Sequence, residues 1–156
     1  MSKNDTWSQN TLDKLTLREK IAQMMIYRMN LRMKDIPVEK WEKILELIDK
    51  DGIGGVHFWY GEASTSLTML NKMQSRSKVP ILVDADIEHG LHQRFPEGTE
   101  VPPFMAIAAS GRPENAYEVG KIVAKESRAV GIHWNFSPVV DAVSYTHLRA
   151  HETQRY

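Results

Sequence analysis

The sequence contains no cysteine among its 156 residues, which excludes disulfide bonds and thiolate zinc sites. It has no excess of charge of either sign, since Lys plus Arg and Asp plus Glu both number 20. Nothing therefore points to nucleic acid or to an anionic membrane as a partner. No apolar run approaches the ~20 residues that a membrane-spanning helix needs. Residues 1–5 are polar, so we identify no signal peptide and expect a cytoplasmic protein.

Helical patterns alternate with short apolar strands along the chain. Thr16 and Glu19 form a capping box at the start of one helix, and Asp35-Ile36-Pro37 opens another. Helices are expected at about 16–24, 37–50, 65–75 and 113–130, and strands at 25–28, 53–59, 80–83 and 133–136. The order predicts an α/β fold with a parallel sheet, either a barrel or an open doubly wound sheet. No Gly-x-Gly-x-x-Gly follows a strand, so no dinucleotide cofactor is expected.

The apolar faces of these helices are also predicted by their spacing. In the helix that starts near Thr16, Leu17, Ile21, Met24 and Met25 fall on one face. In the helix at 113–130, we expect the side chains at positions 116, 119, 123 and 124 to point inward.

The densest polar cluster, residues 84–94, follows the apolar strand at 80–83. Parallel sheets place binding sites at the carboxyl ends of their strands. Three interpretations fit the residues: a sugar-binding loop, a metal site built from Asp, Glu and His, or carboxylates that cap helices and pair with Arg94. His57, Trp59 and Tyr60 end an earlier strand, where we favour packing over ligand contact.

Five ordered segments resemble family 3 glycoside hydrolases. They are Leu-Arg-Glu-Lys-Ile-Ala-Gln-Met at 17–24, Gly-Gly-Val at 54–56, Asp-Ile-Glu-His-Gly at 86–90, Gln-Arg-Phe at 93–95, and the stretch from Ala129 to Asp141. The resemblance covers residues 12–142. It implies the N-terminal part of a (β/α)8 barrel, with about four of the eight βα units in this chain. It also implies a retaining, exo-acting β-glycosidase with a small carbohydrate as substrate.

The resemblance assigns roles to individual residues. Asp86 matches the family aspartate that binds hydroxyls of the sugar beside the cleaved bond, and Arg94 matches an arginine that contacts substrate in the β-N-acetylhexosaminidase branch. Glu88, His89 and Asp141 are expected to contact the substrate-binding residues and hold them in position, without touching the substrate themselves. No metal or other cofactor is implied. The nucleophile and the acid/base are expected beyond the end of this chain.

Asp84 and Asp86 do not suit the role of catalytic pair. We expect their side chains to point to opposite faces of the strand. A chain that holds binding groups without the nucleophile and the acid is expected to be inactive by itself. The alternative from another class is therefore a non-catalytic sugar-binding or scaffold fragment.

Two motifs bear on the substrate. Gln93-Arg94-Phe95 favours a β-N-acetylhexosaminidase, whereas His89-Gly90-Leu91 is closer to the β-glucosidase branch.

Residues 143–156 include Val-Ser-Tyr-Thr-His-Leu-Arg-Ala-His-Glu-Thr, which resembles a translated sequencing adapter. We therefore expect a partial barrel domain over 1–142 and a non-native tail over 143–156. An incomplete barrel exposes strand edges, so self-association is expected.

Overall fold

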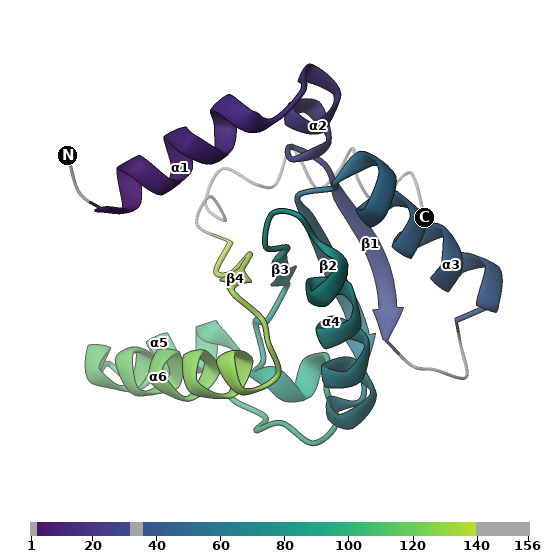
Figure 1. Cartoon of the computed structure of the whole chain (residues 1–156). Helices are drawn as coiled ribbons and strands as arrows, with labels where there is room; N and C mark the ends of the chain where they lie inside the picture. Colours follow the sequence, from purple (N-terminus) through teal and green to yellow (C-terminus); the bar gives the residue numbers. More distant parts are fainter. Residues whose placement is uncertain (1–2, 32–35, 140–156) are drawn as a thin grey trace, which may run out of the picture.

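A computed structural model describes residues 3–31 and 36–139. Its centre is a four-stranded parallel sheet in the order β1-β2-β3-β4, which is not closed into a barrel (Figure 1). The strands are β1 (Ile26–Leu31), β2 (Gly55–Gly61), β3 (Leu82–Ala85) and β4 (Trp134–Asn135). Every sequential strand pairs with the next one, as in the first half of a (β/α) barrel. The α/β prediction is confirmed.

Helices connect the strands. They are α1 (Lys3–Lys14), α2 (Leu17–Ala22), α3 (Val38–Glu46), the π-helical turn η2 (Leu47–Asp51), α4 (Ala63–Arg76), the 3-10 turn η3 (Leu91–Gln93), α5 (Phe104–Ala109) and α6 (Pro113–Ala129). Thr16 caps α2, and its side chain and that of Glu19 bond to each other's backbone, as the capping box predicts. The sequence did not indicate α1, η3 or α5. In the part of the chain that the structure describes, no helix is long and apolar enough to cross a membrane.

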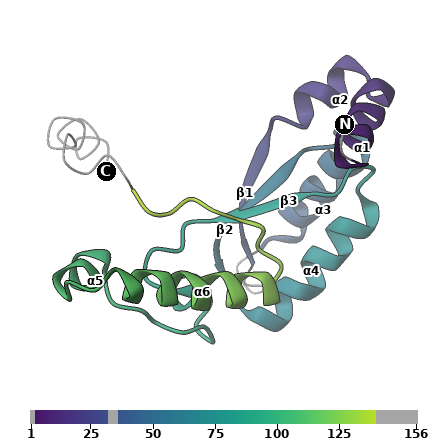
Figure 2. The same ribbon diagram turned by 90° about the vertical axis from the view of Figure 1, so that its left-hand side faces the viewer.

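One face of the sheet is packed against α3 and α4 (Figure 2). Alternate strand residues point to this face. Met29 on β1, Val56 and Phe58 on β2, and Val83 and Ala85 on β3 are buried, and Tyr27 on β1 is half-buried and packs against them. Ile44, Leu45, Leu70 and Met73 of the helices complete the core. Since successive residues of a strand point to opposite faces, the residues between these form a second face, which we call the inner face.

Glycine allows close packing at the start of β2. A Cβ at Gly54 would overlap the backbone carbonyl of Gln23, just after α2. The Gly54 N–H donates to the Ala22 carbonyl at 3.0 Å. The Gly-Gly pair is therefore required for α2 to lie against the amino end of the sheet.

Two predicted apolar faces are not buried. Leu17, Ile21, Met24 and Met25 are all more than half exposed. Along α6, Ala116 and Ala124 are exposed and line a groove of about 780 Å³ beside α5. The inward prediction for α6 is wrong at these two alanines because α6 packs on α5 and η3. Val123 alone of the four residues predicted inward packs against the core.

The inner face predicts self-association of the polypeptide 1–156. Ile26, Leu82, Trp134 and Phe136 are each 39–48% exposed there. Leaving apolar area in water costs about 25 cal/mol per Å², and β1 and β4 are open edges within the described sheet. Size-exclusion chromatography with light scattering should show dimers or larger species.

A matched pair of variants locates the association surface. Trp134→Lys should shift the protein toward monomer, whereas Tyr117→Lys, at a 70% exposed aromatic of α6, should not. A monomeric wild-type polypeptide at micromolar concentration would contradict this prediction.

Candidate functional site

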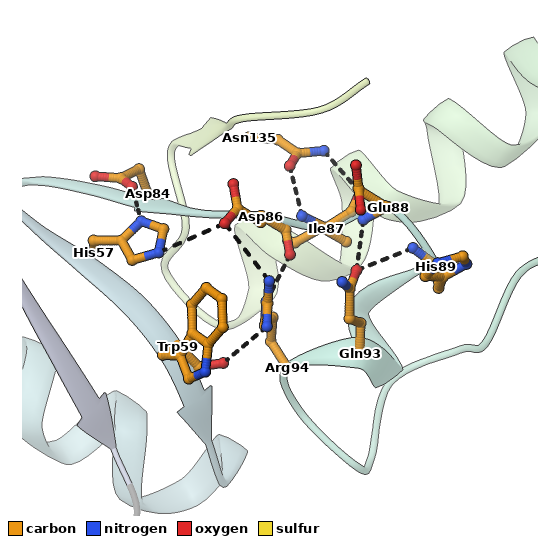
Figure 3. Close-up of polar contacts among 10 residues, drawn as sticks. All are labelled: His57, Trp59, Asp84, Asp86, Ile87, Glu88, His89, Gln93, Arg94 and Asn135. Carbon is orange, nitrogen blue, oxygen red and sulfur yellow. Dashed lines mark hydrogen bonds and ion pairs between the residues drawn. The ribbon is translucent and has the colours of Figure 1, made fainter. Parts of the chain in front are cut away.

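Asp84 and Asp86 lie at the carboxyl end of β3 and share the inner face. The Asp84 side chain is completely buried, and Asp86 is 34% exposed. His57 contacts both: Nδ1 is bonded to Asp84 Oδ1, and Nε2 lies 3.8 Å from Asp86 Oδ2 (Figure 3). The prediction of opposite faces is wrong, because residues two apart on a strand point the same way.

His57 reaches these carboxylates because β2 and β3 pair in register. His57 is the direct partner of Asp84, and Phe58 is the partner of Ala85. Its ring lies between Trp59 and Phe136, at centroid distances of 6.1 and 6.0 Å. The structure thus brings His57 into the site, where the sequence favoured a packing role. The sequence shows a histidine and an aspartate on two strands, but it does not give the register that pairs them.

Arg94 follows η3 and joins the two strands from the loop side. Its Nε donates to the Asp86 carbonyl at 2.7 Å, its Nη1 donates to the Trp59 carbonyl at 3.4 Å, and its Nη2 lies 3.6 Å from Asp86 Oδ2. The guanidinium lies 4.2 Å from the centre of the Trp59 ring, within cation–π range. Arg94 is only 5% exposed. The structure therefore places the two predicted substrate contacts, Asp86 and Arg94, side by side.

The loop between Asp86 and Arg94 is held by two amide side chains. Asn135 of β4 accepts from the Ile87 N–H at 2.9 Å and donates to the Ile87 carbonyl at 3.2 Å. Gln93 Oε1 accepts from the N–H groups of Glu88 and His89 at 2.7 and 3.1 Å. Neither amide was singled out from the sequence, because an Asn or Gln that bonds to backbone has no characteristic spacing.

Glu88 and His89 lie apart from the Asp86 carboxylate (Figure 3). Glu88 is half-buried and lines the groove beside α6. The exposed His89 side chain points away from Asp86 and Arg94 (Figure 3). Asp141, like the tail 143–156, lies outside the described residues. Leu91, at the position that distinguishes the two branches, is buried in the core.

Burial dominates the electrostatics of the site. Desolvation raises the pKa of Asp84, against the lowering effect of the hydrogen bond from His57, and the Asp86 charge raises it further. Desolvation also lowers the pKa of Arg94, which the Asp86 carboxylate opposes. A guanidinium nonetheless remains charged in a folded protein. Asp84 Oδ2 has no hydrogen-bond partner within the described residues.

This arrangement is suited to binding a neutral, hydroxyl-rich ligand. Asp86 presents a partly exposed carboxylate, which accepts hydrogen bonds from hydroxyl groups, and a planar indole lies beside it. Arg28, at 4.1 Å from the same indole, adds a second cation at the edge of the site. Among residues 3–31 and 36–139, no three His, Asp or Glu side chains are placed to hold one metal ion.

Comparison with known proteins identifies relatives of this chain. A β-N-acetylglucosaminidase/β-glucosidase of Cellulomonas fimi is 36% identical over 89 residues, which is 57% of this chain and 16% of that protein. A β-hexosaminidase of Thiobacillus denitrificans is 30% identical over 99 residues, or 57% of this chain and 28% of that protein. The chain thus spans less than a third of either relative.

A solved structure shares the fold. The β-glucoside phosphorylase BglX bound to 2FGlc has a TM-score of 0.76 and 26% sequence identity, over 88% of this chain and 24% of that one. Residues 16–153 match the family described as Glycosyl hydrolase family 3 N terminal domain. The match extends into residues 143–153, for which a non-native origin stays a prediction. By this match over most of its length, the chain belongs to glycosyl hydrolase family 3, as part of the N-terminal domain.

Proposed function

We propose that the intact protein is a retaining, exo-acting β-glycosidase and that this chain supplies part of the subsite for the sugar beside the cleaved bond. The observation that carries the proposal is the position of the Asp86 carboxylate. Its carboxylate stands at the carboxyl end of a parallel strand, partly exposed, with Arg94 and His57 behind it. Sites in (β/α) barrels are built at this end of the strands.

Asp86 binds sugar hydroxyls in this proposal, and Arg94 orients Asp86 and adds donors toward the substrate. Arg94 Nε is already used by the Asp86 carbonyl, so the guanidinium keeps the loop and the carboxylate in one fixed relation. The Trp59 ring lies against the guanidinium groups of Arg94 and Arg28, at 4.2 and 4.1 Å, and helps to fix Arg94 in place. These groups stabilise bound sugar, but none of them breaks the glycosidic bond.

The bond-breaking residues are proposed to lie outside residues 1–156. A retaining mechanism needs a carboxylate nucleophile and an acid/base, with the carboxyl groups roughly 5–5.5 Å apart when both are carboxylic. Asp84 is buried, and its Oδ1 is bonded to His57, so it is not available to attack a sugar carbon. The polypeptide 1–156 is accordingly expected to turn over no aryl glycoside.

The first test concerns the sugar. We favour β-N-acetylhexosaminides, which agrees with the names of the Cellulomonas and Thiobacillus relatives, and β-glucosides are the alternative. The intact protein should cleave nitrophenyl β-N-acetylglucosaminide faster than the β-glucoside at equal concentration. A clear preference for the glucoside would contradict the first assignment and support the second.

The same assay separates water from phosphate as the attacking group. The similarity to a β-glucoside phosphorylase makes this comparison necessary. Hydrolysis predicts free sugar at a rate independent of inorganic phosphate. A sugar 1-phosphate formed in proportion to added phosphate would replace the hydrolase assignment by a phosphorylase.

The second test concerns Asp86. In the intact protein, Asp86→Asn keeps the shape of the side chain and removes its charge. Hydrogen bonds to charged groups are worth about 1.5–3 kcal/mol, so kcat/KM should fall at least about tenfold. Asp51→Asn, at an exposed ion pair with Arg18 far along the chain, is the control and should leave kcat/KM unchanged.

Asp84→Asn should lower kcat/KM less than Asp86→Asn does, because Asp84 does not face the ligand. If the two variants exchanged ranks, the sugar would have been assigned to the wrong carboxylate.

A further inference from the structure

A buried acid and an imidazole lie directly behind the proposed sugar contact and are not used by it. Asp84 is completely buried in the inner face, and its Oδ1 is bonded to His57 Nδ1. Burying a carboxylate destabilises the folded state unless interactions with its partners offset the lost hydration. A position that only had to fill this space would be better served by an apolar residue, such as those on the helix-covered face.

His57 connects this buried acid to Asp86. With Nδ1 directed at Asp84, the only other polar atom of the ring, Nε2, faces Asp86 Oδ2 at 3.8 Å. Arg94 Nη2 approaches the same oxygen at 3.6 Å. The His57 ring and the Arg94 guanidinium therefore both approach one oxygen of Asp86. Within the described residues, no hydrogen bond to Asp86 Oδ1 is present.

Four groups follow one another in the order Asp84, His57, Asp86 and Arg94. A neutral imidazole that donates Nδ1–H to Asp84 would turn the lone pair of Nε2 toward the Asp86 carboxylate. An imidazolium instead donates at both nitrogens and is attracted by both carboxylates. Arg28, the register partner of His57 on β1, lies over Trp59. The charges of Arg28 and Glu88 also act on Arg94.

The ring of His57 has little freedom to turn. It is 13% exposed, and the centroids of the Trp59 and Phe136 rings lie 6.1 and 6.0 Å from its own. Asp84, which anchors it, belongs to the same strand end as Asp86. A shift of the imidazole would therefore move the group that faces the sugar-binding carboxylate.

From this geometry we infer that His57, anchored by Asp84, is a positioning residue that holds one oxygen of Asp86 so that the other faces the sugar hydroxyl. The inference rests on the proposed function and adds the two residues that set the orientation of Asp86. Recognition of one particular hydroxyl then depends on a contact behind the carboxylate as well as on the carboxylate itself.

Two conservative variants of the intact protein separate the two nitrogens of His57. Gln places its amide near the position of Nε2, so His57→Gln keeps a neutral donor toward Asp86 and loses the bond to Asp84. Asn places its amide near Nδ1, so His57→Asn keeps the donor toward Asp84 and loses the one toward Asp86. We expect kcat/KM to fall roughly tenfold in His57→Asn and by less in His57→Gln. His92→Gln, at an exposed histidine bonded to the Pro96 carbonyl, is the matched control and should leave kcat/KM unchanged.

Monodeoxy substrates provide a measurement that a merely structural role would not affect. On the substrate that lacks the hydroxyl bound by Asp86, the kcat/KM of Asp86→Asn should equal that of the wild type. The kcat/KM of His57→Asn should equal that of the wild type on that same substrate. Two results would overturn the inference while leaving the role of Asp86 intact. One is a fall in kcat/KM for His57→Asn that is the same on every deoxy substrate. The other is an equal fall in kcat/KM for His57→Asn and His57→Gln. An unchanged kcat/KM in Asp86→Asn would overturn the proposed function, and this inference with it.

Asp84 gives a prediction for stability. Its pKa is raised by burial, so between its ordinary value near 3.8 and the raised value the folded state binds more protons than the unfolded state. By linkage, the contribution of Asp84 to the free energy of unfolding falls as pH rises through that window and stays low above it. The carboxamide of Asn has no such titration and still accepts from His57.

Asp84→Asn in the intact protein should therefore be as stable as the wild type or more stable at neutral pH, and this advantage should shrink as pH falls toward 4. Its kcat/KM should nevertheless be lowered, because a neutral carboxamide holds the His57 ring less firmly than a carboxylate does. Urea unfolding at several pH values and the glycoside assay measure both. Loss of stability together with unchanged kcat/KM would assign Asp84 to the fold alone and overturn the inference.

Discussion

The in-register parallel pairing of β2 with β3 is the constraint on which this site depends. The pairing runs from Gly55 with Leu82 to Phe58 with Ala85, and a shift of one residue would exchange the two faces of a strand. Val56, Phe58, Val83 and Ala85 are essentially fully buried against α3 and α4, which makes any other register expensive. The same hydrophobic packing therefore sets His57 beside Asp84 on the opposite face.

Polar groups on the inner face are tolerated because each buried one is paired with another from a different element. Asp84 of β3 is bonded to His57 of β2, and Arg94 of the loop is bonded to carbonyl groups of both Trp59 and Asp86. Removing one member of such a set leaves a buried charge without a partner, which is more destabilising than replacing the set as a whole. The isosteric carboxamide variants avoid that problem, since they keep a polar atom in place.

The loop after β3 is fixed at several points along its backbone. Its backbone is held by Asn135 and Gln93 at Ile87, Glu88 and His89. Gly90 has a φ of +80° and packs against the Thr99 carbonyl, and Leu91 enters the core. Leu91 thus anchors the loop in the core, and Arg94 and the His57 ring are the groups that approach the Asp86 carboxylate.

The sequence by itself determined the alternation of helices and strands, the parallel sheet and the capping box at Thr16, and it predicted a binding role for the segment from Asp86 to Arg94. These are local properties: hydrophobic period, capping chemistry and an ordered set of motifs. It also placed Asp86 and Arg94 in one site, since both belong to the same short loop.

The tertiary structure decided what depends on residues far apart in the chain. His57 meets Asp84 across 27 positions and Asn135 meets Ile87 across 48, and only the strand register brings these pairs together. The burial of helix faces was equally beyond the sequence: the apolar spacing of α6 predicted Ala116 and Ala124 inward, yet the helix packs on α5 and η3. Periodicity shows which residues share a face, but the neighbours that cover that face are set by the packing of the whole chain.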